Sequence, residues 1–419
     1  MKNLFTTVIL VLSISVSAQT QAPRWKIEKK FNETIFNTMA FSDSTKGFAA
    51  GWEFDKDLGG FLNPSIKYTM DKGKSWKDAT IDNFNMMPMR ATKANGDTMV
   101  IAGIENNEDG IFSFSYDAGK SWKSQAMPED LYSTYFLNGK EGFVCGKKGY
   151  LAYTKNSGLN WQTVSISTKD DIFSICFAKI GGTLFGYLCG ENGLYATSSD
   201  TGKTWKLSSI SSGFDLSSIV ILKTGKGWMT SLDGVILETS DTGINWSAQF
   251  QNTSLKFNSI SALNDTIAIA GGTKGELLVL KNKKWVSYLT LNSENDEITS
   301  EILNVSIIDK SNMWFCTGEG ELVRTKREDD VSSKVSTIEK SNNKVFYQTI
   351  SDNLVINNIS GRPSHIYIIN SLGSVVEDRE IQAGENSIPC QNLAPGIYKV
   401  KFISKENIGS KVYTFVLNK

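Results

Sequence analysis

The sequence predicts an all-β protein, a seven-bladed β-propeller followed by a small C-terminal β-sandwich. A motif of the form Ser/Thr-x-Asp/Asn-x-Gly-x-x-Trp occurs five times, and an apolar run that usually ends in glycine occurs seven times. Six tryptophans follow one another at separations of 39–46 residues, which suits a four-stranded propeller blade. The expected organisation is a signal peptide at 1–18, a propeller at 19–327, a linker at 328–344 and a C-terminal domain at 345–419.

Each copy of the motif has the residues of a tight turn between two strands. The Asp or Asn side chain can accept hydrogen bonds from backbone N–H groups, and glycine allows a positive φ. The large apolar tryptophan side chain then folds back and packs against the neighbouring sheet. We therefore interpret these acids as structural rather than catalytic. The motif residues are Asp71, Gly73, Trp76, Asp117, Gly119, Trp122, Asn156, Gly158, Trp161, Asp200, Gly202, Trp205, Asp241, Gly243 and Trp246.

This motif resembles the Asp-box (BNR) repeat of sialidase-like and sortilin-like β-propellers and of the Ycf48-type photosystem assembly factors. The resemblance implies the propeller fold. It says little about activity, because one fold hosts many functions. In sialidase-like propellers the Asp-box turns lie on the face opposite the active site, which agrees with a structural role here.

The blade count comes from the apolar runs and the tryptophans together. The seven runs begin at Gly47, Val100, Gly142, Gly186, Gly227, Ile267 and Trp314. Trp285 closes the sixth repeat, whereas the seventh has no tryptophan after it, and Trp25 stands alone near the N-terminus. We therefore expect residues 24–30 to supply the outermost strand of the last blade, which would close the ring and remove an open edge.

The N-terminus has the pattern of a secretory signal peptide. Lys2 precedes an apolar run from Leu4 to Val16, and a small-residue cleavage site follows at Ala18. No later stretch has eighteen consecutive apolar residues, so no transmembrane segment is expected. Basic and acidic residues balance at 44 each, so the sequence has no excess of positive charge that would indicate nucleic-acid binding. Sec export is the expectation.

From about Val345 short alternating strands predict a β-sandwich. The runs Ile366-Tyr-Ile-Ile-Asn-Ser-Leu-Gly and Asn392-Leu-Ala-Pro-Gly-Ile-Tyr resemble the type A C-terminal sorting domain of the type IX secretion system. The family's usual Pro-Asn-Pro opening is replaced by Phe346-Tyr-Gln-Thr-Ile. The resemblance implies that residues 345–419 address the protein to the type IX machinery, so that it is secreted or attached to the outer-membrane surface. A sandwich that binds carbohydrate or packs on the propeller is the alternative.

The five cysteines have no zinc-like or CxxC spacing. Three of them occupy equivalent places in the repeats, so we expect buried small hydrophobes on inner strands, and a Cys145–Cys189 disulfide is the alternative. The only histidine, His365, lies in the tail, so a His-based triad or His-ligated metal is not expected in the propeller. No cofactor and no metal site are predicted.

Sialidase chemistry would need several arginines around a substrate carboxylate, and the propeller has only Arg24, Arg90, Arg324 and Arg327. The Arg-rich patch of Ycf48-like proteins is also missing. A glycoside hydrolase that uses two loop carboxylates stays open.

The first blade has an enlarged loop between its second and third strands, whereas five other blades have a minimal hairpin there. Long loops in compact repeats are often functional, although a simple insertion covering the channel is the alternative. The candidate ligand-binding residues are Trp52, Phe54, Asp55, Asp57, Phe61, Arg90, Glu105, Asp109, Glu191 and Asp233. The leading hypothesis is a non-catalytic propeller that binds a glycan or protein. The alternatives are a glycoside hydrolase or lyase and an envelope-complex assembly factor.

Overall fold

The structure is a computed structural model that describes two compact units, 1–330 and 331–419. In the first unit the described residues are 25–55, 60–82, 86–105, 109–210, 213–288 and 298–325. In the second they are 344–348, 353–358, 364–370, 375–390, 393, 396–403 and 411–417. The expected signal peptide, Asp57 and the expected linker except Lys344 lie outside the described residues.

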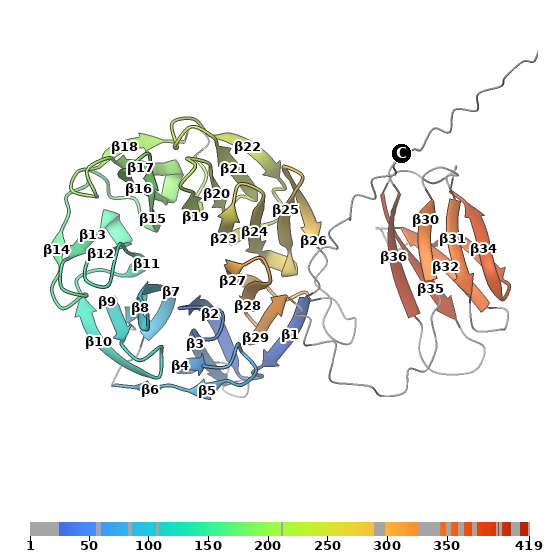
Figure 1. Cartoon of the computed structure of the whole chain (residues 1–419), viewed down its shortest axis with the longest axis horizontal. Helices are drawn as coiled ribbons and strands as arrows, with labels where there is room; N and C mark the ends of the chain where they lie inside the picture. The colour runs from blue at the N-terminus through green and yellow to red at the C-terminus, as the bar shows by residue number, and fades with distance from the viewer. Residues whose placement is uncertain are drawn as a thin grey trace, which may run out of the picture. The chain divides into compact units, whose positions relative to one another are not determined.

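The first unit is a closed ring of seven sheets, and this confirms the predicted propeller (Figure 1). Blade 1 has β2 (Thr34–Phe41), β3 (Gly47–Asp55), β4 (Gly60–Thr69) and β5 (Lys77–Asp78). Blade 2 has β6 (Thr80–Ile81), β7 (Met86–Asn95), β8 (Thr98–Glu105), β9 (Gly110–Ser115) and β10 (Ser121–Met127). Blade 3 has β11 (Leu131–Phe136), β12 (Gly142–Gly146), β13 (Leu151–Thr154) and β14 (Gln162–Thr163). Blade 4 has β15 (Ile172–Ile180), β16 (Thr183–Gly190), β17 (Leu194–Ser198) and β18 (Lys206–Ser209). The strand pairs of the ring are antiparallel except that β6 pairs parallel with β10.

The remaining blades follow the same order. Blade 5 has β19 (Leu216–Ile221), β20 (Gly227–Ser231), β21 (Val235–Thr239) and β22 (Ser247–Gln251). Blade 6 has β23 (Phe257–Asn264), β24 (Ile267–Gly272), β25 (Leu277–Lys281) and β26 (Lys284–Tyr288). Blade 7 has β27 (Ile302–Asp309), β28 (Asn312–Thr317), β29 (Glu321–Thr325) and β1 (Trp25–Lys30). Three 3₁₀ turns, η1 (Lys147–Gly149), η2 (Glu191–Gly193) and η3 (Thr273–Gly275), join second and third strands.

The ring closes through the N-terminal strand, as the orphan tryptophan predicted. Strand β1 pairs antiparallel with β29, with Trp25 opposite Thr325. Trp25 is buried and packs on Phe315 at 5.1 Å between ring centroids. Arg324 donates to the Glu28 carboxylate at 2.8 Å, and both side chains are buried. A buried ion pair and a buried indole therefore fasten the two ends of the ring, and β1 covers the edge of β29.

The propeller core consists of apolar clusters between neighbouring blades. One such cluster joins Val100 and Phe112 of blade 2 to Val144 and Ala152 of blade 3. The middle strands of the blades are buried on both of their faces, which explains their near-continuous apolar runs. Apolar packing between blades, repeated around the ring, is the main source of stability.

The cysteine prediction is confirmed. All five cysteines are buried, and they form no disulfide. Burial raises the pKa of the Cys176 thiol to about 12, so this group stays protonated and behaves as a small apolar side chain.

The second unit consists of two small sheets that share a core. One sheet pairs β30 (Lys344–Gln348), β31 (Asn353–Asn358) and β34 (Gly384–Pro389). The other pairs β33 (Val375–Ile381), β32 (Ser364–Asn370), β35 (Gly396–Ile403) and β36 (Lys411–Leu417). The shared core contains Leu354, Ile356, Ile366, Ile368, Ile381, Ile388, Cys390 and Val400.

In the described part of the chain, no helix has the length and apolar character needed to cross a membrane.

Candidate functional site

The two faces of the propeller are built from different turns. Leu131 at the start of inner strand β11 pairs with Gly146, directly before η1, so inner-strand starts and second-to-third strand turns share one face. Phe136 at the other end of β11 pairs with Gly142, which pairs with Thr154 at the start of the Asp-box turn. We call the first face the mouth face and the second the Asp-box face.

A β-bulge near the start of the inner strand recurs in all seven blades. The bulges place one extra residue each at Asn37, Met89, Tyr132, Phe173, Ser217, Asn258 and Leu303. A bulge leaves its extra residue unpaired and re-aims its side chain. Because the inner strands surround the centre of the ring (Figure 1), the seven bulges form a ring around one mouth of the channel.

A cavity of about 510 Å³ lies within this ring, lined by Asn37, Met87, Tyr132, Phe173, Ser217, Leu232, Asn258 and Leu303. Six of the seven bulged residues are among these lining residues. The lining combines aromatic and aliphatic side chains with hydroxyl and amide groups, which is the usual composition of a binding pocket. We call this cavity the mouth cavity, and it is our candidate functional site.

In blades 4, 5 and 6 the residue after the bulge is a serine that lines the channel and accepts a backbone N–H of the next blade. The Ser174 hydroxyl accepts the Ile219 N–H at 3.3 Å, and the Ser259 hydroxyl accepts the Val305 N–H at 3.3 Å. The equivalent positions are Thr38, Arg90, Ser133, Ser174, Ser218, Ser259 and Asn304. By register Arg90 is therefore the charged member of a set that is otherwise small and polar.

Tyr132 and Phe173 form an aromatic corner of the mouth cavity. Their ring centroids are 5.7 Å apart at an interplanar angle of 60°, and both side chains are half-buried. The Tyr132 hydroxyl donates to Asp171 at 3.1 Å, and the other Asp171 oxygen accepts the Lys148 N–H at 2.9 Å. Asp171 is thereby fixed beside the aromatic pair.

The charges around this corner are mainly negative. Burial, and then the negative charges of Asp171, Asp130 and Glu191, raise the pKa of the Tyr132 hydroxyl. Asp130 is buried and pairs with Lys147 at 3.0 Å through one oxygen, while its other oxygen has no hydrogen-bond partner. The aromatic corner therefore lies in a negative potential.

The enlarged region of the first blade differs from the expected loop. Strands β3 and β4 continue through it, with Trp52 opposite Pro64 and Phe54 opposite Phe61, so the insertion lengthens a hairpin. Within this hairpin, residues 56–59 are the part whose backbone lies outside the described residues. Trp52 is 6% exposed, and this burial leaves little of its ring for a ligand.

The other candidate residues are divided between the mouth rim and undescribed side chains. Glu191 begins η2 and accepts the Asp171 N–H at 3.3 Å, while Asp233 accepts the Asp215 N–H at 2.9 Å. The Glu105 N–H donates to the Asp109 carbonyl at 2.7 Å in the blade 2 hairpin. The side chains of Asp55, Phe61 and Arg90 lie outside the described residues, as does the whole of Asp57.

The bulged residues that line the cavity were missed by the sequence-based reasoning. A signal was present, because six of the seven inner strands have an apolar residue, a variable residue and then a small polar residue around the bulge. Leu131-Tyr-Ser, Ile172-Phe-Ser and Phe257-Asn-Ser are examples. Reading the middle position of this recurring triplet would have found the site.

The Asp-box turns form a closed hydrogen-bond network. In the fourth box the Ser198 hydroxyl donates to Asp200 at 2.8 Å and accepts the Gly202 N–H at 2.9 Å. Asp200 also accepts the Thr204 N–H and hydroxyl, and the Trp205 indole donates to the Gly202 carbonyl at 3.0 Å. The Thr204 hydrogen bonds lower the pKa of Asp200 to about 2. A carboxylate held this way is a poor general acid.

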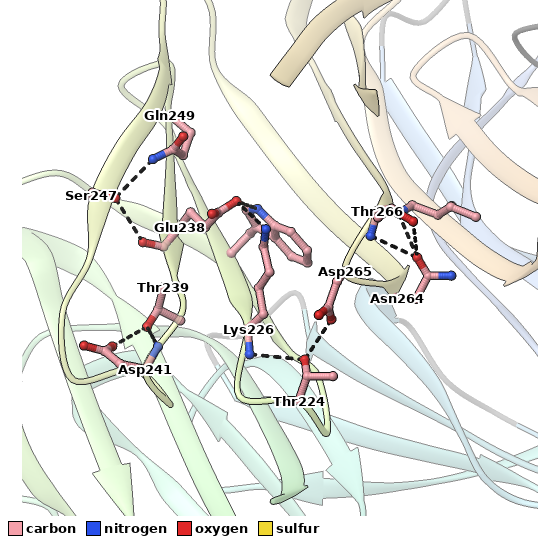
Figure 2. Close-up of polar contacts among 12 residues, drawn as sticks. Thr224, Lys226, Glu238, Thr239, Asp241, Ser247, Gln249, Asn264, Asp265 and Thr266 are labelled. Carbon is pink, nitrogen blue, oxygen red and sulfur yellow. Dashed lines mark hydrogen bonds and ion pairs between the residues drawn. The ribbon is translucent and has the colours of Figure 1, made fainter. Parts of the chain in front are cut away.

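Figure 2 shows part of the fifth box, where the Thr239 hydroxyl donates to the Asp241 carboxylate at 2.8 Å. The Asp241 carboxylate also accepts the Asn245 N–H at 2.9 Å, and the Trp246 indole donates to the Gly243 carbonyl at 3.2 Å. Nearby, Lys226 pairs with Glu238 at 3.3 Å and Thr224 donates to Asp265 at 2.8 Å. The polar groups around this turn are thus engaged in contacts within the chain.

The residue before each Asp-box glycine also has a positive φ, which the sequence did not suggest. Thr201 has φ 65° and Gly202 has φ 79°. A Cβ at Gly202 would lie 2.4 Å from the Phe143 ring of the preceding blade. The glycine is therefore required by interblade contact as well as by backbone conformation.

A larger cavity of about 720 Å³ lies between blades 4 and 5 near the Asp-box face. Two of its aromatic residues already serve the fold: the Tyr187 hydroxyl donates to the Thr242 carbonyl at 3.2 Å and the Tyr195 hydroxyl to the Gly243 carbonyl at 2.9 Å. The cavity therefore lies at the interface between two blades, and the hydroxyls of these two tyrosines already serve to join the blades.

Across the described side chains, no group of three or more Cys, His, Asp or Glu residues is placed to hold a metal ion.

Fold and site together define a seven-bladed β-propeller of the Asp-box class with a lined cavity at one channel mouth. The chain belongs to the family of the photosynthesis system II assembly factor YCF48, whose profile matches residues 126–409. No curated protein matches the chain at a significant level.

Among solved structures, "YCF48 bound to D1 peptide" is similar at 17% identity and a TM-score of 0.57, over 74% of this chain and 97% of that chain. YCF48 from Cyanidioschyzon merolae is similar at 15% identity and a TM-score of 0.54, over 72% of this chain and 98% of that chain. The GH74 xyloglucanase from Xanthomonas campestris is similar at 13% identity and a TM-score of 0.55, over 74% of this chain and 54% of the enzyme. At these identities the likeness concerns the fold.

Proposed function

We propose that this protein is a non-catalytic binding module that holds an extended segment of a protein partner in the mouth cavity. The observation that carries the proposal is the ring of bulges. The same backbone device recurs in seven blades and places a different side chain at the channel mouth in most of them. Different side chains at equivalent backbone positions are what a specific, asymmetric ligand requires.

The lining groups suit a polypeptide. The Asn258 amide nitrogen donates to the Glu301 carboxylate at 2.8 Å and to the Ile302 carbonyl at 3.0 Å, so its side-chain oxygen is the group that can accept from a peptide backbone. Leu303 and Phe173 offer apolar surface for side chains. A solved YCF48 structure is described as bound to a D1 peptide, which supports a peptide as the ligand class for a propeller of this family.

We further propose that the protein is exported by the type IX secretion system. The N-terminal signal-peptide pattern and the C-terminal resemblance of residues 345–419 support this proposal. The protein would then be secreted or attached to the outer-membrane surface. Deletion of 345–419 should leave the protein in the periplasm, as measured by cell fractionation and immunoblotting. Unchanged secretion of the truncated protein would overturn the proposal.

Binding is tested with a displayed library of random peptides and, in parallel, with a panel of glycans and polysaccharides. The full protein should enrich peptides and release no product from the polysaccharides. Leu303→Asn should weaken the selected peptides by roughly tenfold, because it removes apolar contact from the cavity. Leu159→Asn is the matched control, since Leu159 is 58% exposed in an Asp-box turn on the other face.

The other candidate functions are distinguished by the same experiment. Binding of glycans without enrichment of peptides would establish a lectin-like module. Release of product would establish a glycoside hydrolase or lyase. An envelope-complex assembly factor would bind peptides in the way proposed here, and the source of the selected sequences would then identify its complex.

A further inference from the structure

The propeller carries opposite charge on its two faces, although the chain has 44 basic and 44 acidic residues. The third-to-fourth strand turns on the Asp-box face contain the exposed lysines Lys72, Lys74, Lys120, Lys155, Lys203, Lys281, Lys283 and Lys284. The acids in those turns, Asp71, Asp117, Asp200 and Asp241, accept hydrogen bonds from their own turn. Lysines therefore outnumber acids there.

The mouth face has the reverse balance. Around blades 3 to 5 its described acids are Glu129, Asp130, Asp170, Asp171, Glu191, Asp215 and Asp233, against Lys147, Lys148 and Lys169. Lys147 is paired with Asp130 and Lys148 with Glu129. Blade 7 adds Glu301, Glu319 and Glu321 against Lys30, which pairs with the last two. Blade 6 contributes Lys256 and Lys274 against Glu276, so the excess of negative charge at the mouth cavity comes from blades 3 to 5 and 7.

We propose that the mouth cavity selects a basic segment of its partner and seats a lysine or arginine side chain of that segment at the corner formed by Tyr132, Phe173 and Asp171. This inference rests on the proposed function and adds to it the charge of the ligand and the place where that charge binds.

The corner offers both forms of attraction that a cationic side chain uses. Half-exposed aromatic faces attract an ammonium or guanidinium group through the ring quadrupole. The Asp171 carboxylate, held in place by the Tyr132 hydroxyl and the Lys148 N–H, supplies a fixed negative charge at the edge of the pair. Because both groups are already positioned, little conformational entropy is lost when a cation arrives.

The charge of the face acts before contact is made. A rim with one sign of charge around a cavity concentrates ligands of the opposite sign and increases the rate of association. Such steering weakens as salt screens the rim. A basic segment should thus reach the mouth quickly and choose it over the lysine-rich Asp-box face.

The experiment uses the full protein and three fluorescent peptides of equal length, in which the same positions are lysine and arginine, serine, or glutamate. The basic peptide should bind roughly tenfold or more tightly than the serine peptide in fluorescence anisotropy, and its affinity should fall as salt is raised. Asp171→Asn/Glu191→Gln should remove most of this preference while it preserves shape and hydrogen-bonding capacity. The matched control is Asp97→Asn/Asp265→Asn, which removes two charges from the Asp-box face and should leave the preference intact.

A second pair of variants tests the aromatic contact. Tyr132→Phe keeps the ring and should retain binding of the basic peptide. Tyr132→Leu loses the ring and should weaken it about two- to fivefold.

The outcomes separate the inference from the proposed function. Equal binding of all three peptides, or tighter binding of the glutamate peptide, would overturn the inference and leave a peptide-binding module in place. Binding of none of them, with a glycan bound instead, would overturn both. A basic preference that survives in Asp171→Asn/Glu191→Gln but disappears in the control double variant would move the site to the other face and also refute the inference.

Discussion

The two faces of the propeller use repetition in opposite ways. On the Asp-box face the same side chains recur, because each turn needs the same hydrogen bonds and the same close approach of glycine to the preceding blade. On the mouth face the same backbone bulge recurs with different side chains, from Asn37 to Tyr132 to Leu303. The repeated side chains thus stabilise the fold, whereas the repeated backbone bulge with varied side chains is suited to recognition of a ligand.

The largest effect is expected from Trp122→Ala on the Asp-box side. Trp122 is 1% exposed, packs on Phe48 at 4.7 Å between ring centroids, and donates to the Gly119 carbonyl at 2.8 Å. Removal of the ring should lower the free energy of unfolding by about 3–5 kcal/mol, as measured by chemical denaturation. A loss of less than about 1 kcal/mol would contradict a structural role for this face.

A smaller effect is expected from Gly202→Ala, which introduces both an unfavourable φ and a clash with Phe143. The cost should be about 1–3 kcal/mol in the free energy of unfolding. Gly181→Ala is the matched control, because Gly181 also has a positive φ, 55°, but nothing lies within 4 Å of its added Cβ. Equal costs for the two variants would show that the interblade contact contributes nothing.

Acid should remove a part of the stability that the Asp-box carboxylates supply. Hydrogen bonds lower the pKa of Asp200 and Asp241 to about 2, from 3.8. Since these folded-state pKa values are depressed, the contribution is complete above about pH 4 and is lost as the pH falls towards 2. The double variant Asp200→Asn/Asp241→Asn should differ from the wild type in unfolding free energy at pH 6 and converge with it near pH 2. A constant difference across this range would refute the linkage.

The smallest effect on stability is expected at the mouth. Leu303→Asn should change the free energy of unfolding by less than about 1 kcal/mol, because Leu303 is half-exposed at a bulge. The same variant is the one expected to lose partner binding. Thermal melts and binding measurements on one preparation check both statements, and a large loss of stability would remove the distinction between the faces.

The predicted fold and the predicted site differ in accuracy for a physical reason. Blade number, turn positions and ring closure could be derived because they depend on local patterns, such as the Asp-Gly-Trp spacing and the lone Trp25. The cavity could not, because its lining comes from seven strands that are far apart in the chain and meet only when the ring closes.

The first-blade candidates show the same limit. Sequence length alone cannot tell whether inserted residues form a loop or lengthen two strands. The answer depends on the pairing of Trp52 with Pro64 and Phe54 with Phe61. That pairing placed Trp52 in the interior, whereas Glu191 and Asp233 came to the mouth rim as expected from their hairpins.

The sequence by itself determined a seven-bladed Asp-box propeller with a second small β unit, since period, turn chemistry and apolar pattern are properties of neighbouring residues. Only the tertiary structure decided which residues share the channel mouth and how charge is divided between the two faces. Ring closure sets both, because it brings equivalent positions of seven separate strands into one circle and separates the two ends of every strand.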